Sequence, residues 1–137
     1  MASRSDASAV RQALRRLAQS SSDVTAKVMT VRGEVMAASL SQTYKICGKP
    51  NCKCARGEKH LVYHLCWTEQ DGKRRSTHIR ADELVKIQAA VGRYRHLRQC
   101  RAEFFKIASE QASLIDALVE ALSIPPPDKS GGGGGSR

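Results

Sequence analysis

Aromatic side chains are scarce in this chain: two Phe, three Tyr and one Trp make up 4% of its 137 residues. A core built mainly from aliphatic side chains is thin at this length, so a metal ion or an oligomer interface would help to stabilise it. Long apolar runs are missing too, and none approaches the roughly 18 residues of a membrane-spanning helix. The N-terminus has no apolar signal segment. We therefore expect a cytoplasmic protein that makes no membrane contact.

Signatures of common enzymes are also missing. The chain has no phosphate-binding loop, no dinucleotide-binding glycine pattern and no Ser/His/Asp nucleophile motif. Glu58, Glu69 and Asp71 fall in expected loops and make poor candidates for a paired acid and base. His78 and His96 are interpreted as isolated surface or core-edge histidines. We expect no enzymatic activity.

Positive charge is abundant and unevenly distributed. The net charge is +10 and the isoelectric point is about 9.8. Residues 45–106 carry fifteen basic and six acidic side chains, whereas residues 107–137 carry two basic and four acidic ones. Clustered positive charge of this kind is typical of polyanion binders. The sequence therefore predicts nucleic-acid binding, with DNA favoured.

Three of the five cysteines lie within eight residues, at Cys47, Cys52 and Cys54, around a turn that contains Gly48 and Pro50. An odd number of cysteines argues against a closed disulfide framework, and a cytoplasmic protein keeps its thiols reduced. Zinc binds four ligands at tetrahedral angles, and a turn lets nearby thiolates converge on one ion. The cluster therefore predicts a structural zinc site.

The fourth ligand is open among His60, His64 and Cys66, and His60 is favoured because it precedes the next expected strand. Two other interpretations of the cysteines stay open. They could be reduced thiols in a structural loop, or a thiol redox sensor. The redox interpretation has a physical basis, because nearby cations stabilise thiolates. The cations concerned are Lys45, Lys49, Lys53 and Arg56.

Hydrophobic spacing predicts a helix from Asp6 or Ser8 to about Gln19. The polar run at 20–23 predicts a break, after which residues 24–31 would form a second short helix.

Alternating apolar and polar residues predict three antiparallel strands, at 39–46, 61–67 and 73–80. Asp71-Gly72 is a favoured two-residue hairpin turn. Helices around a small antiparallel sheet place the chain in the α+β class.

Apolar residues at steps of three and four over 82–123 predict one helix, or two joined near Cys100, with Asp82 as N-cap and Gly92 as a possible kink. About 40 residues would span roughly 60 Å, too far for a small sheet to cover. We therefore expect the far half to pack on the N-terminal helix, on itself or on another chain, in a homodimer or docked onto a partner. The expected organisation is a disordered start (1–5), a single domain (6–124) with a helical part (6–33), a cysteine and hairpin module (38–80) and the long helix (82–123), and a flexible Pro/Gly-rich tail (125–137).

Basic residues of the cysteine turn, the hairpin and the long helix form the expected nucleic-acid surface. They are predicted to contact mainly the phosphate backbone, since few Asn or Gln side chains are available to read base edges. The residues are Lys49, Lys53, Arg56, Lys73, Arg74, Arg75, Arg80, Arg95, Arg98 and Arg101.

The segment Cys47-Gly48-Lys49-Pro50-Asn51-Cys52-Lys53-Cys54-Ala55, followed by His60 and the Asp71-Gly72-Lys73 turn, resembles an uncharacterised bacterial family of small proteins. Members share a C-G-K-P-x-C-x-C-A segment, a histidine and an aromatic strand, and occur near transposases and recombinases of mobile elements. The resemblance covers about residues 38–100. It implies a DNA-linked accessory role, a recombinase as a possible partner of the long helix, and His60 as the histidine ligand.

Overall fold

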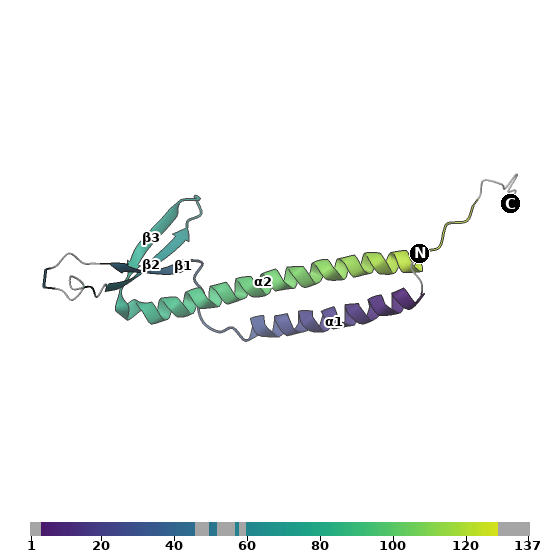
Figure 1. Cartoon of the computed structure of the whole chain (residues 1–137), viewed down its shortest axis with the longest axis horizontal. Coiled ribbons are helices and arrows are strands. Elements are labelled where there is room, and N and C mark those ends of the chain that lie inside the picture. Colours follow the sequence, from purple (N-terminus) through teal and green to yellow (C-terminus); the bar gives the residue numbers. More distant parts are fainter. Residues whose placement is uncertain (1–3, 46–49, 52–56, 58–59, 129–137) are drawn as a thin grey trace. The chain divides into compact units, whose positions relative to one another are not determined.

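The computed structural model describes residues 4–45, 50–51, 57 and 60–128. Five elements follow one another (Figure 1): α1 (Arg4–Met29), β1 (Ser39–Lys45), β2 (His60–Thr68), β3 (Arg74–Ile79) and α2 (Ala81–Leu122). This is the α+β architecture predicted above, with a helix, a three-stranded antiparallel sheet and a long C-terminal helix.

The chain divides into two compact units. The first comprises Met1–Val24 and Phe104–Arg137, and the second comprises Thr25–Glu103. The first unit therefore combines most of α1 with the last part of α2. The second unit contains the sheet and the first part of α2.

Helix α1 runs without interruption, so the predicted break at 20–23 is wrong. Ser20 stays helical because its Oγ donates a hydrogen bond to the carbonyl oxygen of Arg16 at 3.1 Å, one turn back. Gln19 Nε2 donates to Asp23 Oδ1 at 2.9 Å, one turn ahead. Two of the four polar residues that suggested a break, Ser20 and Asp23, are thus hydrogen-bonded within the helix.

The ends of α1 also differ from the prediction. Arg4 and Ser5 are helical, so the expected disorder of residues 1–5 is wrong for these two. The helix ends at Met29, whose carbonyl oxygen accepts a hydrogen bond from Arg32 Nη1 at 2.6 Å. Four residues later, Gly33 has a φ of 101°, a backbone conformation that residues with a Cβ rarely adopt.

Within the first unit, α1 and α2 lie side by side (Figure 1) and each presents its less exposed residues at alternating steps of three and four. That average spacing of 3.5 is the one used by paired helices. The far half of the long helix thus packs on the N-terminal helix, one of the three alternatives expected for it. The residues are Ala7, Val10, Leu14, Leu17, Ser21 and Val24 on α1, and Ile107, Gln111, Leu114, Leu118 and Ala121 on α2.

The sheet has the order β1-β2-β3, with both pairs antiparallel. Its strands fall where alternation predicted them. In the register, Leu65 at the centre of β2 lies opposite Leu40 of β1 and opposite Thr77 of β3.

The hairpin between β2 and β3 has a three-residue loop, not the predicted two-residue turn. Glu69 N–H donates to the carbonyl oxygen of Lys73 at 2.9 Å, and Gly72 N–H donates to the carbonyl oxygen of Glu69 at 2.9 Å. Residues 70–72 therefore close the loop. Gly72 supplies the positive φ, 85°, that such loops need at their last position.

Helix α2 is a single helix of 42 residues, so the alternative of two helices joined near Cys100 is wrong. Asp82 lies in its first turn instead of capping it, and Glu83 N–H donates to the carbonyl oxygen of Arg80 at 3.0 Å. Among the described residues, no helix has the length and hydropathy needed to cross a membrane.

One face of the sheet packs on α2. Leu65 and Ile79 of the sheet and Val91 of α2 are buried at the centre, with exposed fractions of 7%, 8% and 4%. Partly buried side chains surround this centre: Met36, Ala38, Leu40, Tyr63, Trp67, Leu84 and Ile87. The aromatic strand residues therefore serve the core.

The segment between α1 and β1 is bonded to α2. Met36 N–H donates to the carbonyl oxygen of Ala90 at 3.1 Å. Arg93 Nε donates to the carbonyl oxygen of Glu34 at 2.6 Å. These two bonds fix the approach of the chain to the first strand.

Candidate nucleic-acid interface

Strand alternation gives the sheet two unlike faces. The register places Ser41, His64 and His78 in one row across the three strands, on the face opposite Leu65 and Ile79. We call this side the open face. No Asp or Glu occurs at its described positions, which are Ser39, Ser41, Thr43, Lys45, His60, Val62, His64, Cys66, Thr68, Arg74, Ser76 and His78.

Two histidines meet at the centre of the open face. The rings of His64 and His78 have centroids 4.6 Å apart and planes at 88°, an edge-to-face contact. The expectation of an isolated His78 is therefore wrong. The half-buried position of His64 lowers its pKa from 6.5, and the nearby positive charges of His78 and Lys45 lower it further.

The hairpin cluster Lys73-Arg74-Arg75 does not form one basic patch. Arg74 lies on the open face and is exposed, whereas Arg75 lies on the other face and its Nε is 3.5 Å from Glu69 Oε2. Arg80 is also paired, with its Nη2 3.3 Å from Glu83 Oε1. Because side chains alternate along β3, Arg74 and Arg75 lie on opposite faces of the sheet.

The predicted arginines of α2 do gather on one side. Ile87 and Val91 face the sheet, and steps of four, three and three residues continue that side to Arg95, Arg98 and Arg101. All three arginines are exposed. We call them the arginine row. The side of α2 that packs on the sheet at Val91 thus carries basic residues from Arg95 onward, one helical turn after Val91.

Most of the remaining predicted site residues lie outside the residues that the structure describes. Three of the four expected zinc ligands and three expected binding residues lie outside the described part of the chain: Cys47, Lys49, Cys52, Lys53, Cys54 and Arg56. The fourth expected ligand, His60, begins β2 and lies opposite Lys45. Within residues 4–45, 50–51, 57 and 60–128, no group of three or more Cys, His, Asp or Glu is arranged to hold a metal ion.

The two described cysteines occupy different environments. Cys100 is buried, with an exposed fraction of 3%. Its Sγ lies 3.8 Å from His96 Nε2, so His96 is not isolated either. Cys66 is half-buried on the open face, two residues from His64.

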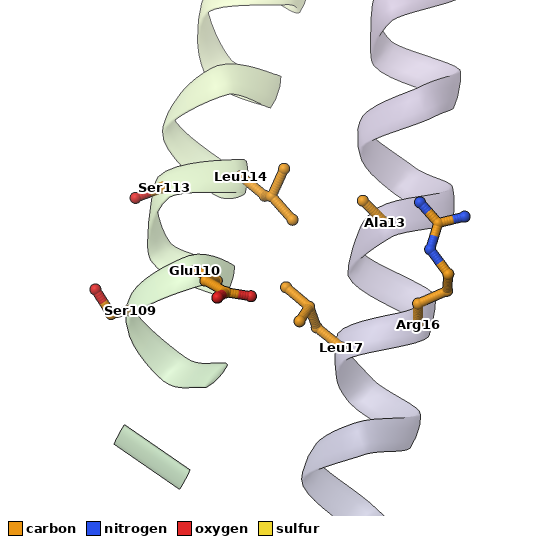
Figure 2. Close-up of a pocket in the computed structure, with 7 residues that line it drawn as sticks. All are labelled: Ala13, Arg16, Leu17, Ser109, Glu110, Ser113 and Leu114. Carbon is orange, nitrogen blue, oxygen red and sulfur yellow. The ribbon is translucent and has the colours of Figure 1, made fainter. Parts of the chain in front are cut away.

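A groove of about 420 Å³ lies between the helices of the first unit. Figure 2 shows Leu17 of α1 and Leu114 of α2 pointing toward each other, while Ser109 and Ser113 point away from α1. The other lining residues are Ala13, Arg16 and Glu110. The groove therefore lies between the two packed helices and has one carboxylate, that of Glu110, in its lining.

The histidine pair is the feature that sequence patterning missed. Its signal was present, because His64 falls at an outward position of a clearly alternating strand. The partner could not be identified without the hairpin register, which the loop length decides.

Comparison with known proteins supplies a family but no relative of known activity. The chain matches the family described as "Domain of unknown function (DUF6788)" over residues 8–89. The match includes the sheet with its histidine pair and stops before the arginine row. Comparisons with curated proteins and with solved structures each found no match. Because the match covers more than half of its length, the chain belongs to the DUF6788 family of unknown function.

Proposed function

We propose that this protein is a non-enzymatic nucleic-acid-binding protein, with DNA as the favoured ligand, that serves as an accessory factor of a mobile element. The net charge of +10 and the fifteen basic residues in 45–106 support binding to a polyanion. The link to mobile elements rests on the resemblance of the cysteine segment.

The arginine row is the observation that carries this proposal. Arg95, Arg98 and Arg101 are exposed on one side of a helix, at successive rises of about 4.5 Å. Guanidinium groups spaced in this way can contact consecutive phosphates along a strand. Such contacts carry little sequence information, so affinity is electrostatic and falls steeply with salt.

A mobility-shift titration of a DNA duplex at several salt concentrations tests the proposal. Replacing Arg95, Arg98 and Arg101 with Gln removes about three phosphate contacts, so the salt slope of log K should fall by about 2 to 3. The matched control removes three charges elsewhere, by Arg11→Gln, Arg15→Gln and Lys27→Gln on α1. Equal losses in both triple variants, or wild-type binding that ignores salt, would overturn the assignment.

A structural zinc ion is part of the same proposal. Cys47, Cys52, Cys54 and His60 would supply three thiolates and one imidazole, a closed ligand set typical of structural sites. The ion would join the chain after β1 to the start of β2. The support comes from the sequence spacing and from the position of His60 at the first residue of β2.

A second candidate function is dimerisation or adaptor activity through α2. Phe104, Ile115, Val119 and Leu122 stay 45–61% exposed in the first unit although α1 packs beside them. Helical spacing places these four residues on one side of the helix. Contiguous exposed apolar surface is typical of interaction sites. Light scattering after gel filtration tests this candidate. Ile115→Glu with Val119→Glu should abolish a dimer, whereas Val85→Glu, at a 76% exposed position of the same helix, should preserve it. A wild-type monomer at every concentration would contradict self-association.

A further inference from the structure

We infer that the open face of the sheet is a second phosphate-binding surface, on which His64, beside His78, takes up a proton when nucleic acid binds. The inference rests on the proposed nucleic-acid function and adds to it a site and a proton linkage. It concerns residues outside the arginine row and outside the predicted basic surface, except for Arg74.

The composition of the open face is suited to phosphate. Lys45 and Arg74 supply permanent charge from the two edge strands, and hydroxyl groups of Ser41 and Ser76 flank the histidines in the register. No carboxylate stands at any described position of this face to repel a phosphate. Phosphate oxygens accept hydrogen bonds from hydroxyl, ammonium, guanidinium and imidazole groups alike.

The geometry brings both imidazoles to one place. His64 and His78 are directly paired across β2 and β3, with ring centroids 4.6 Å apart. His78 is exposed on the edge strand. Two protonated rings at this distance repel each other unless an anion lies beside them. A phosphate group between or above the rings would supply that anion.

The local electrostatics make proton and phosphate binding cooperative. The groups facing His64 on this side are Lys45 from β1, His60 and Cys66 from β2, and His78 with Arg74 from β3. Partial burial and, after it, the positive neighbours His78 and Lys45 keep the pKa of His64 below 6.5 in the free protein. A bound phosphate cancels part of this positive field and restores the proton. By linkage, a ligand that raises the pKa must itself bind more tightly as the pH falls.

A metal ion is a weaker explanation of the same pair. Two imidazoles provide only half of a tetrahedral ligand set. The described part of the chain adds no third His, Cys, Asp or Glu in position to complete one. The positive field that disfavours a proton at His64 disfavours a metal cation as well.

Fluorescence anisotropy of a labelled random-sequence DNA duplex tests the inference, with the full chain titrated at pH 5.5 and at pH 8 in constant ionic strength. Uptake of one proton on binding gives up to about tenfold tighter binding per pH unit within the titration range. We expect wild-type affinity to rise at least about threefold at the lower pH. The double variant His64→Gln, His78→Gln should lose most of this rise.

Two further variants make the result specific. His96→Gln removes a histidine of α2 that lies beside Cys100, away from the sheet, and should keep the full pH effect. His78→Arg places a permanent charge on the open face and should tighten binding at pH 8. Circular dichroism at both pH values confirms that each variant is folded.

The outcomes separate the two proposals. A double variant that binds DNA with the wild-type pH dependence overturns the open-face site and leaves the arginine row in place. An equal loss of the pH effect in His96→Gln also overturns it. Wild-type protein that fails to bind DNA at either pH overturns both proposals.

Discussion

The side chain of Arg93 reaches back 59 residues in sequence to the backbone of Glu34, where its Nε donates a 2.6 Å hydrogen bond to the carbonyl oxygen. Arg93 is the first arginine of α2, the helix that also carries the arginine row. Its side chain, however, is bonded to the backbone of its own chain. One arginine therefore secures the segment that leads into the sheet.

Replacing Arg93 with Ala should destabilise the protein by about 1.5 kcal/mol, because a charged donor to a carbonyl oxygen is lost. Urea denaturation measures the change. Arg95→Ala on the same helix serves as the control and should change stability by less than about 0.5 kcal/mol, since its side chain is exposed. Equal effects in the two variants would show that the bond to Glu34 contributes nothing.

Gly33→Ala should destabilise the protein by about 1 to 3 kcal/mol. The residue has φ of 101°, and a Cβ there would lie 2.9 Å from Arg93 Cζ. Gly92→Ala is the matched control, because its Cβ would meet nothing within 4 Å in the middle of α2. That substitution should stabilise the helix by about 0.5 to 1 kcal/mol. Opposite signs in thermal melts are the expected result, and a neutral Gly33→Ala would contradict the positive φ.

Folding stability should decrease as the pH falls below 6.5. Partial burial, His78 and Lys45 lower the pKa of His64 in the folded chain. A lowered folded-state pKa means that protons bind the unfolded chain more readily. The contribution of His64 to stability is therefore fully present above its pKa in the unfolded chain. It is lost as the pH falls through its pKa in the folded chain. Thermal unfolding from pH 8 to pH 5 measures this loss.

In the same pH series, His78→Gln removes one cause of the lowered pKa and should reduce the loss, whereas His96→Gln should keep it. A pH dependence that is the same in all three proteins would show that the histidine pair does not set it.

Native mass spectrometry should find one zinc ion per chain. Cys52→Ser removes a predicted ligand and should abolish retention of the ion, while Cys66→Ser, whose side chain lies on the open face, should keep it. The same spectrum reports the number of subunits. A chain that carries no metal after purification with zinc would leave the cysteine turn without its proposed role.

The sheet could be predicted because its signals are local. Leu61, Tyr63, Leu65 and Trp67 alternate with more polar residues, and alternation of this kind fits only a half-covered strand. The helix-forming period of residues 82–123 was equally clear. The class of the fold and the position of its strands follow from these two periods alone.

Two predictions that were wrong, the helix break at 20–23 and the two-residue hairpin turn, both rested on residue types that favour turns. The polar run at 20–23 suggested a helix end, but the helix continues, and Ser20 donates its hydroxyl hydrogen bond to the Arg16 carbonyl oxygen inside α1. Asp71-Gly72 suggested a two-residue turn, which would have set His64 opposite Ile79. The three-residue loop shifts the pairing by one residue and sets His64 opposite His78.

The candidate site was predictable only in part, for the same reason. The arginine row follows from helical spacing, so sequence alone could identify it. The separation of Arg74 from Arg75 and the meeting of two histidines depend on strand pairing between distant residues. No local sequence pattern encodes that pairing. The predicted zinc ligands Cys47, Cys52 and Cys54 lie outside the described residues.

The three-residue hairpin loop also constrains how this chain can evolve. A one-residue slip of β3 along β2 would exchange inward and outward positions along β3, and Ile79 would leave the core as His78 entered it. Changes of loop length that keep Glu69 opposite Lys73 leave every side chain on its own face. Lineages that alter this loop should therefore preserve that pairing, and a family member with a slipped pairing should show a compensating bulge in the same strand.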